Sequence, residues 1–455
     1  MTHRSPSISP TRPGPRRARS LAAVAAVAAV AAGSLAACGS SVKSSSGGGG
    51  GGDSIQMWVA GNSTTKPIYT AEAAAYSKTH NVSVSLTDLP GPAYTQKLDA
   101  ALAAGKPPAI YQLFSPGPQM KTLVAGHHLA DLSSLVSGPG GLKSRILPTA
   151  LAQGQLDGKQ YGIPYNIFQE SVVIYSKPDF KKAGITGTPA TWSDLMADVG
   201  KLKKAGFIPA ATAGSESNNW YELWLENYEV HLAGLGVSQS LQKGDYKALD
   251  TAPVVKAATA MQQLIKTSPF EPGYTTTSES NDVPYALIGT GKAAMVLNGA
   301  YTPNFIEDVA PSFVKKGQMG WFSFPAVTAG GDDAIDLSSQ PQLVVSADQS
   351  KAKISASEAF LKSFVFSTPQ EHALASSGNV GPEANAADLV SKYAPKDLKS
   401  YMEFQLSEAS KPKDSFLSWS QYIPTSQTDT WNSLLEKLFS LKISPQAFAR
   451  QAAKM

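Results

Sequence analysis

The stretch Ile55-Gln56-Met57-Trp58-Val59 opens the pattern that decides the fold, because it predicts a short β-strand. Residues 65–80 carry apolar side chains at helical spacing, and residues 82–86 alternate apolar with polar side chains as a second strand would. Residues 94–102 again fit a helix, and residues 109–113 fit a third strand. Strand, helix, strand, helix, strand predicts the beginning of a parallel sheet.

The alternation continues to the C-terminus, which places the whole body in the α/β class. Thr191-Trp192-Ser193-Asp194 has the form of a capping box and predicts a helix that starts there. Further strands are predicted at 171–175, 207–211, 293–297, 319–324 and 343–345, and further helices at 220–232, 254–266, 356–366, 369–376, 430–441 and 445–454. About 400 residues exceed one ordinary core, so two domains are expected.

Residues 1–37 have the layout of a secretory signal peptide. Five arginines and no acidic residue precede the apolar run 21–32, and small residues follow it. The run is too short for a membrane-spanning helix, which needs about 20 apolar residues. Arg16-Arg17 leaves the twin-arginine export route open beside the general one.

Cys38 is the single cysteine of the 455 residues, so no intramolecular disulfide can form. Leu35-Ala36-Ala37-Cys38 resembles the bacterial lipobox, in which the cysteine is lipidated and becomes the new N-terminus. Residues 39–53 are rich in glycine and serine and predict a flexible tether. We therefore expect a protein anchored through Cys38 to the outer face of the cell membrane.

The charge of the body is close to neutral once the leader is removed. The full chain has 39 Lys and Arg against 35 Asp and Glu, and all five leader charges are arginines. Arg145 and Arg450 are the two arginines that remain, which gives no concentrated basic face for nucleic acid.

Local motifs of catalysis are missing from the sequence. It contains no HExxH zinc helix, Walker A loop or GxSxG elbow. Gly289-Thr290-Gly291-Lys292 lacks the spacing of a phosphate loop and predicts a turn into the following strand. His127 and His128 are adjacent and would point apart, so we expect no metal site and no cofactor. Paired carboxylates for glycoside hydrolysis have no local spacing rule and stay open.

Several segments, in order, resemble the sugar-binding proteins of ABC importers, the family of maltose-binding protein. Similar stretches are Lys97–Pro108, Asp157-Gly158-Lys159-Gln160-Tyr161-Gly162-Ile163-Pro164, Val173–Ile185, Pro189–Leu195, Gly291-Lys292-Ala293-Ala294-Met295 and Gly299-Ala300-Tyr301. Two positions depart from the family pattern, because Ala109 and Ser176 replace its usual aspartate and asparagine. Each motif is weak alone, and the ordered set covers most of residues 54–455.

The resemblance implies a two-lobed periplasmic-binding-protein-like fold of type II, with a hinge and discontinuous lobes. We place the first lobe at 54–164 plus 325–377 and the second at 165–324 plus 378–455. A sugar or oligosaccharide would bind in the cleft between the lobes and favour their closed state. The closed form, expected to be a monomer, would deliver the solute to ABC permease subunits, and no catalytic residue is assigned.

Sugar recognition needs aromatic faces for the C–H surface of the ring and amide or carboxylate groups for its hydroxyls. By resemblance, the polar loop Ser215–Tyr221 holds the aromatic stacking segment, which nominates Asn219, Trp220 and Tyr221. We expect Trp220→Ala to weaken binding with little loss of fold stability. Tyr301 matches the family's aromatic after Gly299.

Other candidates follow the rule that ligands of open α/β sheets sit at the carboxyl ends of strands. These are Asn62, Gln112, Ser115, Asn166 and Gln169, with Gln340 and Asn379 from two further loops. The remaining tryptophans singled out, Trp58, Trp192, Trp321 and Trp431, are predicted to be core or capping residues.

Four hypotheses for the function stay open. The main one is a carbohydrate-binding lipoprotein, and a binding protein for another small solute is its nearest competitor. The scarcity of arginine disfavours an anionic solute, although lysine could substitute in part. A lipid-anchored hydrolase would instead need two carboxyl groups about 5–9.5 Å apart in the cleft. A scaffold or adhesion lipoprotein would not close on a solute.

Overall fold

A computed structural model gives the positions of residues 54–61, 65–89, 91–115, 117–166, 171–215, 220–278, 282–328, 334–336, 340–410 and 415–455. The predicted leader, Cys38 and the tether lie outside these described residues. Helices and strands alternate along the described chain, so the predicted α/β class is confirmed. Within the described ranges, no helix combines the length and the apolar character needed to cross a bilayer.

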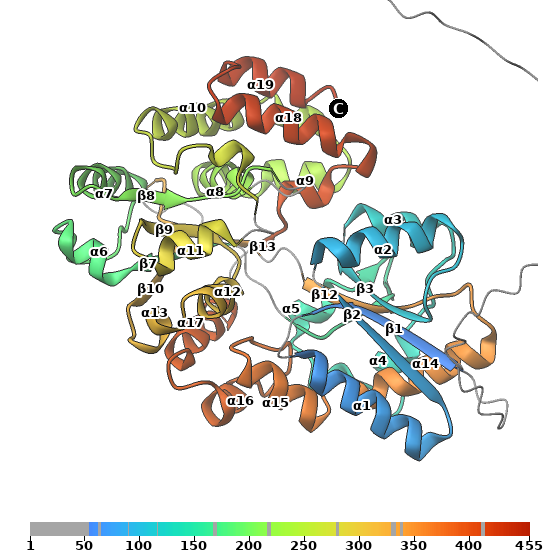
Figure 1. Ribbon diagram of the computed structural model, residues 1–455. Coiled ribbons are helices and arrows are strands. Elements are labelled where there is room, and N and C mark those ends of the chain that lie inside the picture. The colour runs from blue at the N-terminus through green and yellow to red at the C-terminus, as the bar shows by residue number, and fades with distance from the viewer. Residues whose placement is uncertain are drawn as a thin grey trace, which may run out of the picture. The chain divides into compact units, whose positions relative to one another are not determined.

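The first sheet has the strand order β2, β1, β3, β12, β6. Figure 1 labels the first four of these strands. These strands are Ser83–Leu89, Ser54–Ala60, Ile110–Ser115, Gln340–Val345 and Gly162–Pro164. β1 pairs in parallel with both β2 and β3, as the sequence predicts. β12 runs antiparallel to β3 and to β6, so the complete sheet is mixed.

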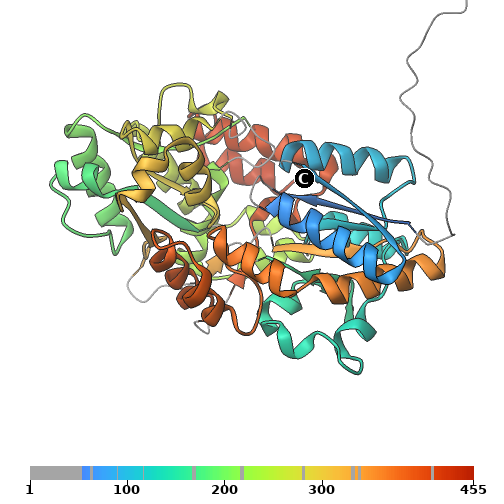
Figure 2. The same cartoon turned by 60° about the horizontal axis from the view of Figure 1, so that its bottom comes forward.

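Helices cover both faces of the first sheet, which explains the pattern of β1. Its alternate residues Ile55, Met57 and Val59 are at most 1% exposed and pack in the core formed with α1 (Thr65–His80) and α14 (Lys351–Phe364). On the opposite face, Trp58 and Ala60 pack in the cluster formed with α2 (Gly91–Ala103) and α3 (Pro118–Ala125). Figure 2 shows α1 and α14 in front of the sheet from another direction.

The second sheet has the order β10, β7, β9, β8. The strands are Met319–Ser323, Val172–Ser176, Ala293–Asn298 and Ile208–Ala211, and only the β8–β9 pair is parallel. The turn predicted at residues 289–292 is confirmed, because it leads from α11 (Val283–Gly289) into β9. The capping box is also confirmed, since Thr191 and Asp194 exchange hydrogen bonds of 3.0 and 3.2 Å at the start of α7 (Trp192–Lys204).

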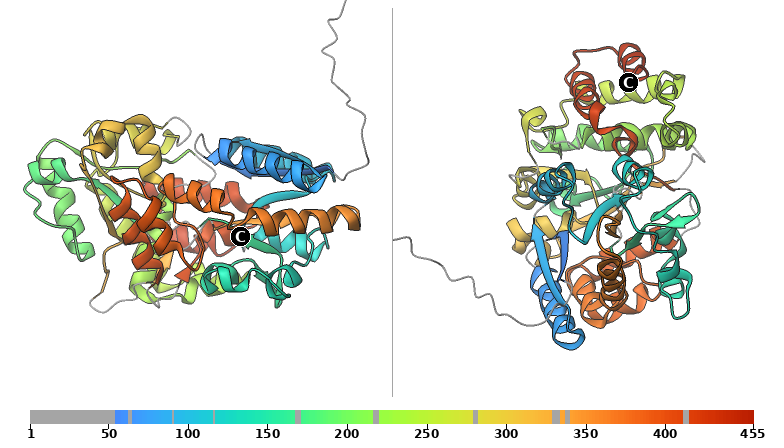
Figure 3. Two further views of the ribbon diagram at one scale, coloured as in Figure 1. Left: turned by 90° about the horizontal axis from the view of Figure 1, so that it is seen from below. Right: turned by 90° about the vertical axis from the view of Figure 1, so that its right-hand side faces the viewer.

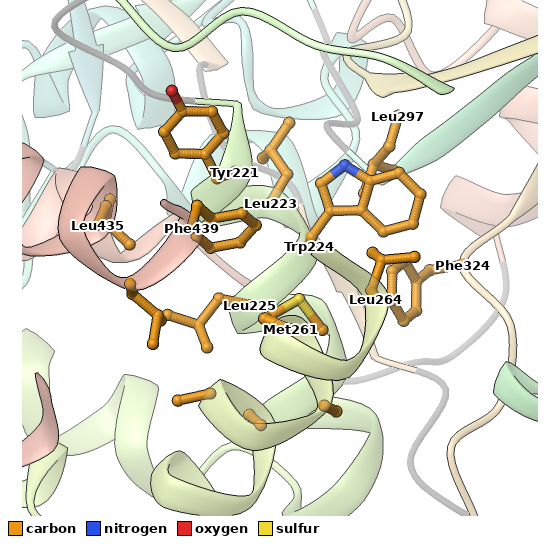
Figure 4. Packing of buried hydrophobic residues seen from close by; sticks show 14 of the residues in the cluster. Tyr221, Leu223, Trp224, Leu225, Met261, Leu264, Leu297, Phe324, Leu435 and Phe439 are labelled. Carbon is orange, nitrogen blue, oxygen red and sulfur yellow. The ribbon is translucent and has the colours of Figure 1, made fainter. Parts of the chain in front are cut away.

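The largest core lies among helices on one side of the second sheet. α8 (Tyr221–Ala233) and α10 (Ala252–Lys266) pack with α18 (Thr428–Phe439) and α19 (Pro445–Ala452) around buried leucine, methionine and aromatic side chains (Figure 4). The red C-terminal helices lie against the yellow-green α10 in Figure 3. Tyr221, the first residue of α8, is buried in this core.

Most of the remaining helices are short, and most of them were not predicted. They are α4 (Ser133–Ser137), α5 (Pro148–Ala152), α6 (Lys177–Lys182), α9 (Gly236–Gln242), α12 (Thr302–Val309), α13 (Pro311–Lys315), α15 (Thr368–Ser376), α16 (Ala386–Tyr393) and α17 (Lys399–Ser410). Of these helices, α15 matches the one predicted at 369–376. The previously described α14 starts five residues earlier than predicted.

Two short strand pairs lie outside the two main sheets. β4 (Gln155–Leu156) and β5 (Lys159–Gln160) form a hairpin whose two loop residues, Asp157 and Gly158, both have positive φ of 51° and 76°. Such a loop favours Asp-Gly, because glycine adopts this backbone without cost. β11 (Ile335–Asp336) and β13 (Ser415–Phe416) pair in parallel where two separate connections meet.

The chain passes between the two sheets more than once. It leaves the first sheet after β6, builds the second, and returns with β12. After α15 it goes back, since Leu398 and Tyr401 around α17 pack with the second sheet's strands. The first sheet is therefore discontinuous in sequence, while the lobe boundaries at 164, 324 and 377 stay a prediction.

Candidate ligand-binding site

The Gln112 side chain on β3 contacts the end of β1 and the residue that follows β6. Its side-chain oxygen accepts a hydrogen bond of 2.9 Å from the Ala60 N–H at the end of β1 and one from the Tyr165 hydroxyl after β6. The Tyr94 hydroxyl clamps the Gln112 backbone, donating to its carbonyl at 2.7 Å and accepting from its N–H at 2.9 Å. Gln112 is 2% exposed, so these bonds make it a positioning residue beneath the strand ends.

Two of the predicted residues meet across the sheet. Ser115 and Gln340 are register partners at the open ends of β3 and β12. Asn166 is the second residue after β6, which runs in the same direction as β3 because both are antiparallel to β12, and it is 8% exposed. Asn62, Gln169 and Asn219 lie outside the described residues.

Asp88 is a carboxylate at this edge that was not predicted from the sequence. It lies near the end of β2, is 6% exposed, and its Oδ2 has no hydrogen-bond partner among the described residues. Gly61 permits its approach, because a Cβ at residue 61 would lie 2.4 Å from Oδ2. Burial raises the pKa of Asp88 to about 6, and Lys66 opposes that shift. The strand-end rule applied to Asn62 and Gln112 would have found it.

Trp220 and Tyr221 are adjacent in sequence but pack in different cores. Trp220 is 3% exposed and packs on Tyr285, with ring centroids 5.6 Å apart. Tyr221 is fully buried and stacks on Phe439 with ring centroids 4.8 Å apart (Figure 4). Tyr274 meets Tyr221 edge to face, with a centroid distance of 5.9 Å. The rings are therefore held by protein contacts that already cover them.

This burial corrects the expectation for Trp220→Ala. Removing a buried indole costs about 3–5 kcal/mol of stability, so the variant would not leave the fold unaffected. Tyr301 is a better position for testing ligand contact, because its ring is only partly buried.

Tyr301 joins Trp220 through two further polar and aromatic side chains. The Tyr301 hydroxyl donates to Asn298 Oδ1 at 3.2 Å, and Asn298 Nδ2 donates to the Tyr285 hydroxyl at 3.4 Å. Tyr285 in turn contacts Trp220. Two residues nominated from the sequence are thus connected by Asn298 and Tyr285, which were not nominated.

Asn379 contacts α12, the helix that begins directly after Tyr301. Its Oδ1 accepts a hydrogen bond of 3.4 Å from Asn304 Nδ2, one turn beyond Tyr301 on α12, and its own Nδ2 donates to Ser377 at 2.7 Å. Asn379 is 7% exposed. Aromatic and amide groups therefore gather around the start of α12, which suits an uncharged hydroxylated ligand.

Metal-ligating side chains are not gathered in the described part of the chain. Its His, Cys, Asp and Glu residues form no cluster of three that could hold a metal ion. His128 Nδ1 instead pairs with Asp348 at 2.9 Å on the surface.

Residues 60–370 match the sequence profile of bacterial extracellular solute-binding proteins. The chain belongs to this family. The match covers more than half of the 455 residues and spans both sheets of the solute-binding protein. Its description agrees with the family resemblance of the individual motifs.

Curated relatives match only part of the solute-binding protein. A predicted binding protein of Brucella abortus is 27% identical over 194 residues, which is 41% of this chain and 43% of the relative. An uncharacterized ABC transporter extracellular-binding protein of Pyrococcus horikoshii is 25% identical over 260 residues, or 55% of each chain. The alignments thus span about half the length of these relatives.

Solved structures match the solute-binding protein over nearly its full described length. A chitin oligosaccharide binding protein superposes with a TM-score of 0.75 at 22% identity, covering 89% of this chain and 98% of that one. The maltose-bound MalE3 of T. maritima gives 0.69 at 18%, covering 88% and 98%. The GacH receptor of Streptomyces glaucescens gives 0.68 at 18%, covering 89% and 97%. These likenesses confirm the predicted two-lobed binding-protein fold.

Proposed function

We propose that this solute-binding protein captures a sugar or oligosaccharide outside the cell and delivers it to the permease of an ABC importer. The observation that carries the proposal is the partly buried Tyr301 ring beside the partly exposed amide of Asn304 at the start of α12. The buried Asn298 and Tyr285 side chains hold Tyr301 in place through a chain of hydrogen bonds. Such a mixture recognises the apolar faces and hydroxyls of a neutral sugar.

The names of the structural neighbours are consistent with this ligand class. One binds chitin oligosaccharide, another holds maltose, and the GacH receptor was obtained in complex with acarbose. The Pyrococcus horikoshii relative is named as part of an ABC transporter, which supports delivery to a permease. The chain would act as a monomer that closes its lobes on the ligand and releases it unchanged, with no catalytic step.

The first test is thermal unfolding of residues 38–455 carrying Cys38→Ser against monosaccharides, oligosaccharides, amino acids and polyamines. A ligand present at 100 times its dissociation constant stabilises the folded state by about 2.7 kcal/mol, and the midpoint rises accordingly. We expect a rise with one sugar series. A rise confined to amino acids or polyamines would refute a sugar ligand, and conversion of a sugar during incubation would favour a hydrolase.

Tyr301→Ala is expected to weaken sugar binding about five- to thirtyfold. The substitution removes the aromatic face that the proposal places against the sugar, and loss of such a contact costs about 1–2 kcal/mol. The measurement is titration calorimetry with the sugar found in the unfolding screen. Tyr393→Ala, which removes a partly buried tyrosine from α16, is the matched control and should bind like the wild type.

Cys38→Ser is expected to release the protein from the membrane. We propose that lipidation of Cys38 anchors the exported chain, because several acyl chains on one residue hold a protein stably at a bilayer. Fractionation of cells should find wild-type protein in the membrane and the variant in the medium or periplasm. Identical fractionation of the two proteins would contradict the anchor.

A further inference from the structure

One face of α12 carries a stripe of side chains suited to carbohydrate. Tyr301, Asn304, Phe305 and Asp308 are spaced i, i+3, i+4 and i+7, so the helix turns all four to the same side. The intervening Thr302, Pro303 and Ile306 are buried, which makes the stripe the outward face of the helix. Only Tyr301 of the four was nominated from the sequence.

Phe305 is a fixed ring with one face open. It is 36% exposed, and its inner face stacks on the fully buried Tyr285 at 5.0 Å with an angle of 11° between the planes. Tyr301 meets it at a centroid distance of 5.7 Å and 78°. Covering the exposed face of a phenyl ring is favourable, because it removes apolar surface from water. Since Phe305 is already held by its neighbours, little further side-chain entropy is lost when a ligand packs on it.

Polar groups flank this ring along the same stripe. Asn304, which precedes Phe305, is partly exposed and is oriented by its 3.4 Å hydrogen bond to Asn379. Asp308, one turn further, is exposed and can accept hydrogen bonds from hydroxyl groups. The stripe thus alternates an aromatic ring, an amide, a second aromatic ring and a carboxylate.

We propose that Phe305 is a second stacking subsite beside Tyr301, so that the ligand is a saccharide of at least two linked pyranose rings. One ring lies at Tyr301 and the next lies on the open face of Phe305, while Asn304 and Asp308 bind its hydroxyls. This inference rests on the proposed sugar-binding function and adds the size of the ligand. Phe305 is not an isolated exposed apolar side chain, because its ring contacts the ring of Tyr301.

The test is titration calorimetry of wild type, Phe305→Ala and Phe305→Tyr with three series of sugars. The probes are N-acetylglucosamine with its β-1,4-linked dimer and trimer, xylose with xylobiose and xylotriose, and glucose with maltose and maltotriose. For the series that binds, Phe305→Ala should weaken disaccharide binding about three- to tenfold and leave the monosaccharide within twofold. Phe305→Tyr keeps the ring and should bind like the wild type.

Leu441→Ala is the matched control, because Leu441 is 44% exposed and lies after α18, outside the stripe. It should bind every sugar like the wild type. A wild type that binds sugar while Phe305→Ala changes neither sugar, or both equally, would overturn the subsite alone. Failure of the wild type to bind any sugar in the three series would overturn this inference together with the proposed function.

Discussion

Trp431→Ala is expected to lower the free energy of unfolding by about 4–8 kcal/mol. The Trp431 side chain is fully buried among the helices that pack on the second sheet, with Phe448 at 5.8 Å and Trp419 at 6.4 Å between ring centroids. Loss of a buried indole leaves a cavity that costs about 3–5 kcal/mol. Its Nε1 also donates a 3.1 Å hydrogen bond to Glu222, which is 2% exposed. Removing a hydrogen-bond donor from a buried carboxylate costs about 1–3 kcal/mol more.

The loss can be measured by guanidinium unfolding followed by far-UV circular dichroism. Trp431→Phe, which keeps a ring but removes the donor, should lose about 1–3 kcal/mol. Trp58→Ala is the matched control for the larger change, because the Trp58 ring is only partly buried and carries Lys97 Nζ over it at 4.4 Å. A Trp431→Ala variant that unfolds at the same denaturant concentration as Trp58→Ala would contradict the packing described for α18.

Glu229→Gln is expected to stabilise the protein by about 4–5 kcal/mol at pH 8 and by less than about 1 kcal/mol near pH 4.5. Glu229 lies on α8, is 1% exposed, and neither carboxylate oxygen has a hydrogen-bond partner among the described residues. Burial raises the pKa of this carboxyl to about 8. In the unfolded chain the group titrates near its ordinary value of about 4.3, so the folded state binds the extra proton between these two values.

The sign follows from proton linkage. Stability falls with rising pH wherever the folded state binds more protons than the unfolded state. Glu229 therefore destabilises the fold progressively from about pH 4.5 to pH 8, and a tenfold difference in proton affinity between the two states corresponds to about 1.4 kcal/mol. Glutamine has a similar shape and no charge, so its advantage over glutamate grows across the same window.

The measurement is the difference in unfolding free energy between Glu229→Gln and wild type at pH 4.5, 6 and 8. Other buried acids, including Asp88, are present in both proteins and cancel from this difference. Glu436→Gln is the control, because that side chain is 46% exposed beside Lys442, and its difference should stay within about 1 kcal/mol at every pH. A difference for Glu229→Gln that does not grow with pH would refute the buried, unpaired position of Glu229.

The regular part of the fold was predictable because its signals are local. β1 alternates between two covered faces, and α7 starts at a capping box formed by residues three apart. The antiparallel entry of β12 was not predictable, because it depends on a strand that joins β3 from more than 200 residues away. Short helices such as α12 begin without a side-chain cap and give no equivalent signal.

The candidate site was predictable only in part. The strand-end rule and the family resemblance nominated Gln112, Tyr301 and Asn379. The structure places Gln112 inside β3 and not after it, and it places Tyr301 and Asn379 at or beside the start of α12. Asn304 and Phe305 were missed because their exposure depends on which face of α12 is covered. The burial of Tyr221 was equally hidden, since Phe439 approaches it from a helix more than 200 residues later.

The most direct test of the central claim is titration calorimetry of residues 38–455, with Cys38→Ser, against the oligosaccharide that raises the unfolding temperature, followed by chromatography of the recovered sugar. We expect saturable binding of one oligosaccharide per chain and recovery of that sugar unchanged. Absence of heat with every sugar that raises the unfolding temperature, or recovery of shortened products, would contradict a protein that binds a sugar and releases it intact.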